Sequence, residues 1–401
     1  MKKSALSFLI ILPCLLAAPP QAPKLDTTTF VVVGDGLAAG MADFALRDVY
    51  QKNSFPALMA KQMKTAFPQP FIQPPGIGSV PGFPALPVAA PGPWQTSVRT
   101  PFPPPLFVFN LAVPGHHLED AISLRPVPPL VQQGNWKQTA TNLVLGYPAM
   151  ILGPNKPLWS QMEYAIEMNP TLVLVELGYT EAIEAAAHAD PTLIPDPAAF
   201  HTNYAKLLAA LQSTYAQVVT TTIPDPVDTA YFSTAASVAH LTGTTAGALN
   251  SRYGLNSGDL LSPNAVFESA LESTPLPPGS VTSAATAAEI SKRVQALNSE
   301  ITSVSKSAGA VVYDLHGLFS RLRSSGYAVG NLSLTSNYLG GLYSLSGFYP
   351  GWTVHALIAN DILALLNQTY NTSFPLVNLS SVAPKDPAVR FRPYAVRETA
   401  Q

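Results

Sequence analysis

Short apolar runs alternate with longer amphipathic stretches along most of the chain. β-Branched runs that end in glycine or in a polar residue are typical of buried strands. The pattern predicts strands at Thr28–Val33, Phe107–Leu111, Leu172–Leu177, Val218–Thr222 and Ala310–Asp314. Helical spacing predicts helices at Phe55–Phe67, Ser160–Met168, Ala198–Thr214, Thr286–Ser307 and Trp352–Asn367. Strands that alternate with helices predict an α/β fold with a parallel sheet covered on both faces.

Two of the predicted helices carry a start signal. Ser160 is followed three residues later by Glu163, which predicts a capping box, and Pro170 ends that helix. Thr286 and Glu289 predict a second capping box near the start of the longest helix. Because ligands gather at the carboxyl ends of strands in such folds, we expect a cleft at that edge of the sheet.

Two stretches interrupt the alternation of strands and helices. Residues 68–105 hold many of the chain's 40 prolines, which predicts an extended insertion whose apolar residues pack on the core. Residues 226–278 are rich in serine, threonine, alanine and glycine, which predicts an insertion with short helices that could form a lid. We expect one domain over residues 28–385 and a C-terminal tail over 386–401.

The first 22 residues have the pattern of an export signal. Two lysines precede an apolar run from Ala5 to Leu16, which is too short to span a bilayer comfortably. We expect residues 1–22 to direct export to the periplasm or the extracellular space, and an uncleaved signal that anchors the chain is an alternative. Cys14 is the single cysteine, and Pro13 before it disfavours a lipid anchor there.

Composition and charge limit the classes of partner. The chain has 401 residues with a hydrophobic fraction of 47%, which is enough for a large core. Charged residues make up 11%, below the usual share of about a quarter, and the formal net charge is −2. No basic run is present, so the sequence disfavours nucleic acid as a partner.

A glycine-rich turn follows the first predicted strand directly. The segment from Gly34 to Gly40, GDGLAAG, resembles the first signature of the SGNH, or GDSL, hydrolase family. That family has its nucleophilic serine where this chain has Gly36. Residues 110–115 resemble the second block of the family, in which the glycine that corresponds to Gly115 offers its backbone N–H to the oxyanion.

Two later segments resemble the remaining blocks of the SGNH family. Residues 172–181 resemble the third block, and the oxyanion asparagine of the family corresponds to Thr180. Residues 340–350 resemble the last block, in which the catalytic aspartate corresponds to Ser346 and the catalytic histidine to Tyr349. The resemblance covers nearly the whole chain and implies a three-layer α/β/α, flavodoxin-like fold with a parallel sheet and no cofactor.

The four chemical positions of the family all differ in this chain. An acyl-transfer serine needs a base, a group that orients the base, and donors aimed at the oxyanion. Gly36 cannot attack a carbonyl, and Tyr349, with an ordinary pKa of about 10, is a poor base near neutral pH. Loss of a triad nucleophile alone costs on the order of a million-fold in rate. The resemblance therefore implies a fold that has kept its scaffold and lost its chemistry.

Four polar residues near the expected cleft allow a sharper interpretation. His116 and His117 follow the second block, and the fold is expected to bring Asp35 and Glu181 close to them. Such a group could hold a metal or supply a relocated base. The interpretation that we favour is that both histidines are ordinary polar residues at a helix start and that Asp35 holds its own turn.

Three functional hypotheses follow from the sequence. The first is an exported pseudoenzyme whose cleft binds a small ester, acyl or glycan ligand, or a partner protein of the cell envelope, without turnover. The second is an active ester hydrolase with a rebuilt site that uses His116 or His117. The third is an envelope structural protein that acts through the proline-rich insertion at residues 68–105.

Overall fold

The computed structural model describes the chain in several stretches, namely residues 24–80, 94–100, 107–147, 149, 153 and 157–390. The predicted export signal, part of the proline-rich stretch and most of the predicted tail lie outside the described residues. Within the described part, no helix combines the length and the apolar character that crossing a membrane requires.

A parallel sheet forms the centre of the fold. Its hydrogen-bonded strands are, in spatial order, β1 (Phe30–Gly34), β4 (Leu172–Glu176), β5 (Gln217–Thr221) and β9 (Val311–Tyr313). On the free edge of β1, Asn110 forms a parallel bridge with Val32. In chain order the arrangement is 2-1-3-4-5, which is the flavodoxin-like order.

The predicted strands are confirmed with one qualification. Four of them exist with ends shifted by one or two residues, but the segment predicted at 107–111 pairs with β1 only through the bridge at Asn110. Every residue of β1 and β4 is buried, because helices cover both faces of the sheet. Their near-continuous apolar sequence follows from this double burial.

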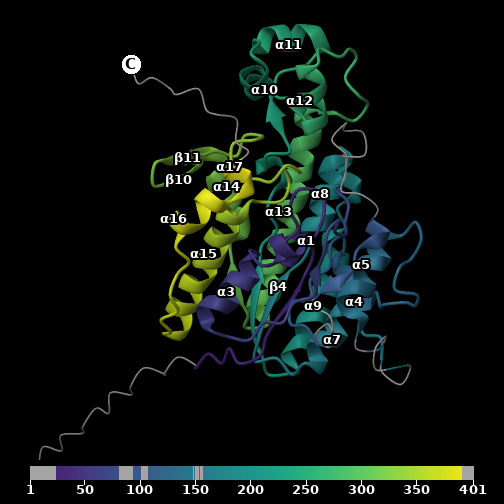
Figure 1. The fold of residues 1–401 in the computed structure, drawn as a ribbon, viewed down its shortest axis with the longest axis vertical. Helices are drawn as coiled ribbons and strands as arrows, with labels where there is room; N and C mark the ends of the chain where they lie inside the picture. The colour runs from purple at the N-terminus through teal and green to yellow at the C-terminus, as the bar shows by residue number, and fades with distance from the viewer. Residues whose placement is uncertain are drawn as a thin grey trace, which may run out of the picture.

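Helices cover both faces of the sheet and make a three-layer α/β/α fold (Figure 1). On one face, α3 (Phe55–Met63) packs against α15 (Trp352–Tyr370). On the other, α4, α7 and α9 contact one another, and α13 packs along α9. The bounds of these four helices are α4 Leu118–Ser123, α7 Gln161–Glu167, α9 Pro197–Gln212 and α13 Ala284–Ser307.

Shorter elements complete the body of the fold. The helices are α1 Gly36–Ala39, α2 Asp48–Gln51, α5 Trp136–Leu145, α8 Tyr179–Ala187, α14 Leu315–Ser325, α16 Leu379–Val382 and α17 Pro387–Arg390. The strands are β2 Phe71–Ile72, β3 Arg99–Thr100, β10 Tyr327–Val329 and β11 Leu332–Leu334. In the described part of the proline-rich stretch, β2 pairs with β3, and Ile72 and Ile77 are fully buried in the core.

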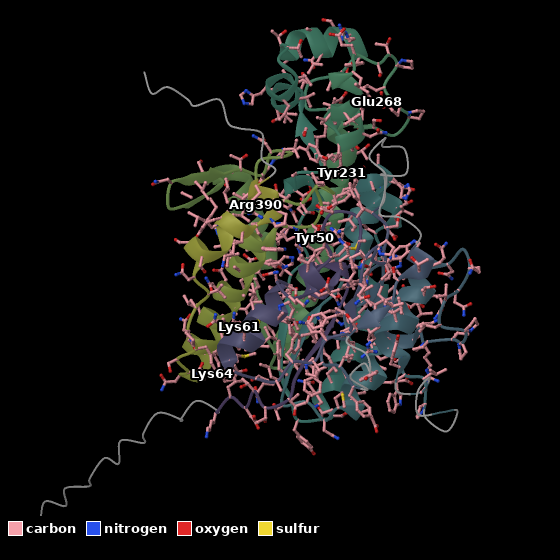
Figure 2. All side chains as sticks on the ribbon, in the orientation of Figure 1. Tyr50, Lys61, Lys64, Tyr231, Glu268 and Arg390 are labelled. Carbon is pink, nitrogen blue, oxygen red and sulfur yellow. The ribbon has the colours of Figure 1, made fainter. Side chains whose placement is uncertain are left out.

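Residues 233–282 form an accessory region at one end of the molecule (Figure 1). It contains β6 Ser233–Thr234, α10 Ala235–Thr242, α11 Ala246–Tyr253, β7 Leu260–Leu261, α12 Pro263–Ala270 and β8 Val281–Thr282. The region has its own small apolar cluster, centred on Val238, Leu249 and Leu261. Tyr231, labelled in Figure 2, lies where this region joins the body.

One of the two predicted capping boxes is confirmed. Ser160 accepts a hydrogen bond from the backbone of Glu163, whose carboxylate accepts one from the Ser160 N–H at 2.9 Å. The second box was wrong, because α13 starts earlier than predicted. Ser283 is its N-cap and accepts from the N–H of Thr286 at 3.1 Å, so Thr286 lies inside the first turn.

The longest C-terminal helix takes its N-terminal cap from a distant residue. Gly351, the N-cap residue of α15, has no side chain that could cap the helix. Asp386 is fully buried, and its Oδ2 accepts hydrogen bonds from the N–H of Thr353 at 2.8 Å and from the Thr353 hydroxyl at 2.7 Å. The start of the segment predicted as a tail therefore completes α15.

We expect Asp386→Ala to lower the free energy of unfolding by about 1–2 kcal/mol, since it leaves these two donors without an acceptor. Urea denaturation followed by circular dichroism measures the change. Lys385→Ala is the matched control, because Lys385 is exposed beside it. Equal midpoints for the two variants would show that Asp386 does not cap α15.

Candidate functional site

The site lies where β1 and β4 end, which is the point at which the order of the strands reverses. Ligands bind at such a point in open α/β sheets. Asp35 follows β1 directly and is fully buried. Its Oδ1 accepts the N–H of Leu37 at 3.1 Å, and its Oδ2 accepts the N–H of Thr180 at 2.8 Å. Asp35 therefore caps α1 and joins it to the start of α8.

A second buried carboxyl group lies at the end of β4. Glu176 Oε2 accepts the N–H of Ala38 at 3.0 Å, while the Glu176 carbonyl accepts the N–H of Asp35 at 3.1 Å. Burial raises the pKa of Asp35 to about 6, against the hydrogen bonds that it accepts. Burial and the nearby charge of Asp35 raise the pKa of Glu176 well above its ordinary value. Because Asp35 accepts two backbone N–H groups, the proton of this pair resides on Glu176.

Tyr349 fills the space above Gly36. A Cβ built on Gly36 would lie 2.5 Å from the Tyr349 hydroxyl and 3.0 Å from its Cζ. The Tyr349 ring is 2% exposed and packs edge to face on Tyr179, with ring centroids 6.0 Å apart. Burial raises the pKa of Tyr349 well above its ordinary value, so the phenol stays protonated. A side chain at position 36 has no room unless Tyr349 moves.

The loop that carries Tyr349 is fixed by hydrogen bonds at both ends. Ser346 is fully buried, and its Oγ accepts the N–H of Tyr349 at 3.2 Å and bonds Ser344 Oγ at 3.1 Å. Ser344 Oγ also accepts the N–H of Asp43 at 2.9 Å, which ties the loop to the segment after α1. Ser346 is thus a turn hydroxyl that supports the backbone of Tyr349.

The segment that leads into the accessory region packs against the same loop. Tyr231 stacks on Phe348 with ring centroids 3.9 Å apart. Gly347 has a φ of +76°, and a Cβ there would lie 2.7 Å from the Cα of Tyr231. Only glycine fits this position, because both the backbone conformation and the close approach exclude a side chain.

The glycine of the second block is covered by an indole. Gly115 has a φ of +76°, and the space in which its Cβ would lie is occupied by the six-membered ring of Trp136 at the start of α5. Its loop lies against β1, since Val113 N–H donates to the Gly34 carbonyl at 3.1 Å. Thr180, at the family's asparagine position, is 3% exposed and its Oγ1 has no partner in the described part.

His116 is buried and fully hydrogen-bonded. Its Nδ1 pairs with Gln161 Nε2 at 2.8 Å, and its Nε2 pairs with Thr141 Oγ1 at 2.8 Å. Gln161 Oε1 accepts the N–H of Gly34 at 3.0 Å, so the imidazole helps to hold the end of β1. Burial lowers the pKa of His116 to about 3. With both ring nitrogens engaged, His116 has no free lone pair with which to act as a base.

His117 caps α4 and carries a positive charge. Its Nε2 is hydrogen-bonded to Glu184 Oε2 at 2.8 Å, and its backbone N–H donates to Asp120 Oδ2 at 3.0 Å. Partial burial opposes the charge, but Glu184 and Glu181 outweigh it and raise the pKa of His117 to about 9. A histidine that is protonated at neutral pH is not a general base.

Glu181 lies next to this charged group. Its Oε1 accepts the N–H of Leu118 at 2.8 Å, and its Oε2 has no hydrogen-bond partner among the described residues. Burial raises the pKa of Glu181 to about 7, against the attraction of His117. In the described part of the chain, no three metal-ligating side chains of histidine, cysteine, aspartate or glutamate come together.

Most of the residues expected to line a cleft are buried, and we call this the filled site because rings occupy the space beside Gly36 and Gly115. Asp35, His116 and Glu181 were predicted to line it, but each is at least nine-tenths buried, and only Gly115 and His117 are partly exposed. Two bulky rings contribute to this burial. Tyr349 covers Gly36 and Trp136 covers Gly115.

Two residues of the site escaped sequence reasoning. Glu176 lies in the run LVLVELG, inside the strand predicted at Leu172–Leu177, and the sequence analysis assigns it no role in a carboxyl pair. A single acidic residue inside an apolar strand is itself the signal that could have found it, since a buried carboxyl group needs a partner. Nothing in the local sequence links Trp136 to Gly115.

Comparison with known proteins gives a remote likeness only. No protein-family model matches the chain, and no curated protein matches it. Among solved structures, LAE5, an alpha/beta hydrolase enzyme from the metagenome of Lake Arreo in Spain, is 13% identical with a TM-score of 0.38, over 86% of this chain and 96% of that chain.

Two further solved structures are similar at the same level. TesA is 11% identical with a TM-score of 0.35, over 85% of this chain and 98% of that chain. The acetyl xylan esterase AlAXEase is 10% identical with a TM-score of 0.35, over 84% of this chain and 98% of that chain. At these scores the likeness carries no argument, and the fold rests on the strand order.

The buried carboxyl pair gives a pH-dependent prediction. A carboxyl group whose pKa is raised by folding stabilises the protein below its unfolded pKa and loses that contribution as the pH rises through the folded value. Glu176→Gln keeps an acceptor for the Ala38 N–H but cannot titrate. We expect its free energy of unfolding, measured relative to wild type, to be higher at about pH 8 than at about pH 5 by about 1 kcal/mol or more.

Urea denaturation at both pH values measures this difference. Glu167→Gln is the control, because it makes the same substitution at an exposed position of α7. The same pH dependence in both variants would mean that Glu176 does not hold a proton in the folded state.

Proposed function

We propose that this chain is an exported, SGNH-like pseudoenzyme that acts by binding and not by turnover. The observation that carries the proposal is the position of the Tyr349 hydroxyl, 2.5 Å from where a side chain on Gly36 would begin. Both the nucleophile and the space for it are absent. A substrate carbonyl has no place to approach the end of β1.

The electrostatics of the site also support a binding role. None of these groups is available as a base: Glu176 is protonated, both ring nitrogens of His116 are hydrogen-bonded, and His117 is cationic. Because the site is filled, the ligand or envelope partner of the proposal binds elsewhere on the surface. Export, with or without an uncleaved anchor, rests on the pattern of residues 1–22.

The alternative is an active ester hydrolase with a rebuilt site. It requires His117 to lose its proton near neutral pH and a nucleophile beside it. The hydrogen bond to Glu184 at 2.8 Å opposes the first requirement. No serine, threonine or cysteine side chain is hydrogen-bonded to His117 in the described part.

Turnover of short p-nitrophenyl esters by the purified chain distinguishes the pseudoenzyme from the active hydrolase. We expect wild type to match its heat-denatured blank. A variant with Gly36→Ser, Thr180→Asn, Ser346→Asp and Tyr349→His opens the space above position 36 and supplies the missing groups, and we expect it to exceed wild type by about 100-fold or more.

Gly36→Ser alone is the matched control. It adds the nucleophile without moving Tyr349, so it should stay inactive and lose stability. Wild-type turnover well above the blank, abolished by His117→Ala, would establish the rebuilt site and overturn the proposal.

A further inference from the structure

A groove lined by polar residues lies beside β5 and β9, away from the filled site at the ends of β1 and β4. Its volume is about 630 Å³, and it is shallow and widely open to solvent. It runs along α13 from the residues that follow β5 and β9 toward Lys306, which precedes β9, so one end of it lies at the carboxyl ends of strands. Ligand sites of globular proteins have volumes of roughly 300–1,000 Å³. The size of the groove is therefore that of a small-molecule site.

The wall that α13 contributes is a continuous polar stripe. Six side chains at helical spacing face the groove: Gln295, Asn298, Ser299, Thr302, Ser303 and Lys306. None is acidic, aromatic or aliphatic. The stripe thus offers hydroxyl, amide and ammonium groups along about three turns of one helix.

The opposite wall is held rigid by its own hydrogen bonds. Thr222 Oγ1 donates to Asp314 Oδ1 at 3.3 Å and accepts the N–H of His316 at 2.9 Å. Across the groove, the Asn298 amide bonds both backbone groups of Ile223, at 2.6 and 2.9 Å. The loop after β5 is therefore clamped to α13 and to the loop after β9.

Other polar groups of the groove have no partner within the described part of the chain. The side chains of Gln295, Thr302, Ser303 and Lys306 make no hydrogen bond or ion pair there, and the buried Nδ1 of His316 has none either. The exposed groups are available to a ligand in place of water, and the buried Nδ1 of His316 is the one for which a ligand would supply a missing partner.

We propose that this groove binds a neutral saccharide. The lining carries one cation, Lys306, and one carboxylate, Asp314, so it favours neither an anion nor a cation. None of its lining residues has an aliphatic side chain, so it lacks the branched apolar groups that usually hold an acyl chain. A ligand that presents many hydroxyl groups, each able to donate and accept, matches the mixture of amide, hydroxyl, carboxylate and imidazole groups.

This proposal deepens the binding role proposed above and rests on it. The two can fail separately, because ester turnover reports on the filled site and saccharide binding reports on the groove. If wild type hydrolyses esters but also binds saccharide in the groove, the pseudoenzyme proposal fails and this one stands.

Isothermal titration calorimetry of the purified chain with chitotriose, cellotriose and maltotriose tests the proposal. We expect at least one of them to bind with a Kd of about 1 mM or below. Ser303→Trp fills the groove from an exposed position of α13, and we expect it to weaken that binding by about tenfold or more.

Ser324→Trp on α14 is the matched control, since Ser324 is exposed and does not line the groove. It should bind as wild type does, and both variants should keep the wild-type melting temperature. Absence of binding by all three trisaccharides, or binding that Ser303→Trp leaves unchanged, would overturn the proposal. Displacement of the saccharide by inorganic phosphate would mean that Lys306 makes an anion site instead.

Discussion

The contact between the Tyr349 phenol and Gly36 determines what the rest of the structure can do. At the carboxyl end of β1, a glycine leaves room for one large side chain, and Tyr349 occupies it. Tyr179, at the start of α8, packs against the Tyr349 ring, and Ser346 Oγ accepts the backbone N–H of Tyr349. Close packing of this kind tolerates neither an added methyl group nor an approaching ligand. The end of the sheet at which such folds bind ligands has thereby become part of the core.

The charges around the contact follow from its burial. A carboxyl pair can persist in a closed interior only if it shares a proton or gains donors, and Asp35 and Glu176 do both. His116 is neutral because water cannot reach it, whereas His117 at the rim keeps its proton beside Glu184. The same residue types that could serve catalysis in an open cleft serve here to join β1, α4, α7 and α8.

The sequence predicts the frame of this fold well and the state of its site less well. Buried parallel strands are continuous apolar runs, so four strands and the helices between them could be found from local patterns. The segment at 107–111 has the same composition but only bridges β1, because the neighbouring strand is decided by long-range pairing. The cap of α13 was misplaced by one turn, since Ser283 and Thr286 are both good N-caps and only the structure selects between them.

The order of the four sequence blocks suggests that Gly36 and Tyr349 belong to one site. It does not suggest that the Tyr349 side chain fills the space beside Gly36. Whether a cleft stays open depends on side-chain volume at positions far apart in the chain. Trp136 and Gly115 illustrate this, because no local signal connects them. The residues at the block positions show which side chains differ from the family, whereas the packing of Tyr349 over Gly36 is visible only in the folded structure.

A double-mutant cycle between Gly36→Ala and Tyr349→Phe tests this closure most directly. The cycle compares free energies of unfolding and needs no assumption about substrate. We predict that Gly36→Ala costs about 1–3 kcal/mol in wild type and clearly less once the Tyr349 hydroxyl is removed, because that oxygen makes the closest contact. An equal cost in both backgrounds would mean that the phenol oxygen does not contact position 36, which would contradict the account.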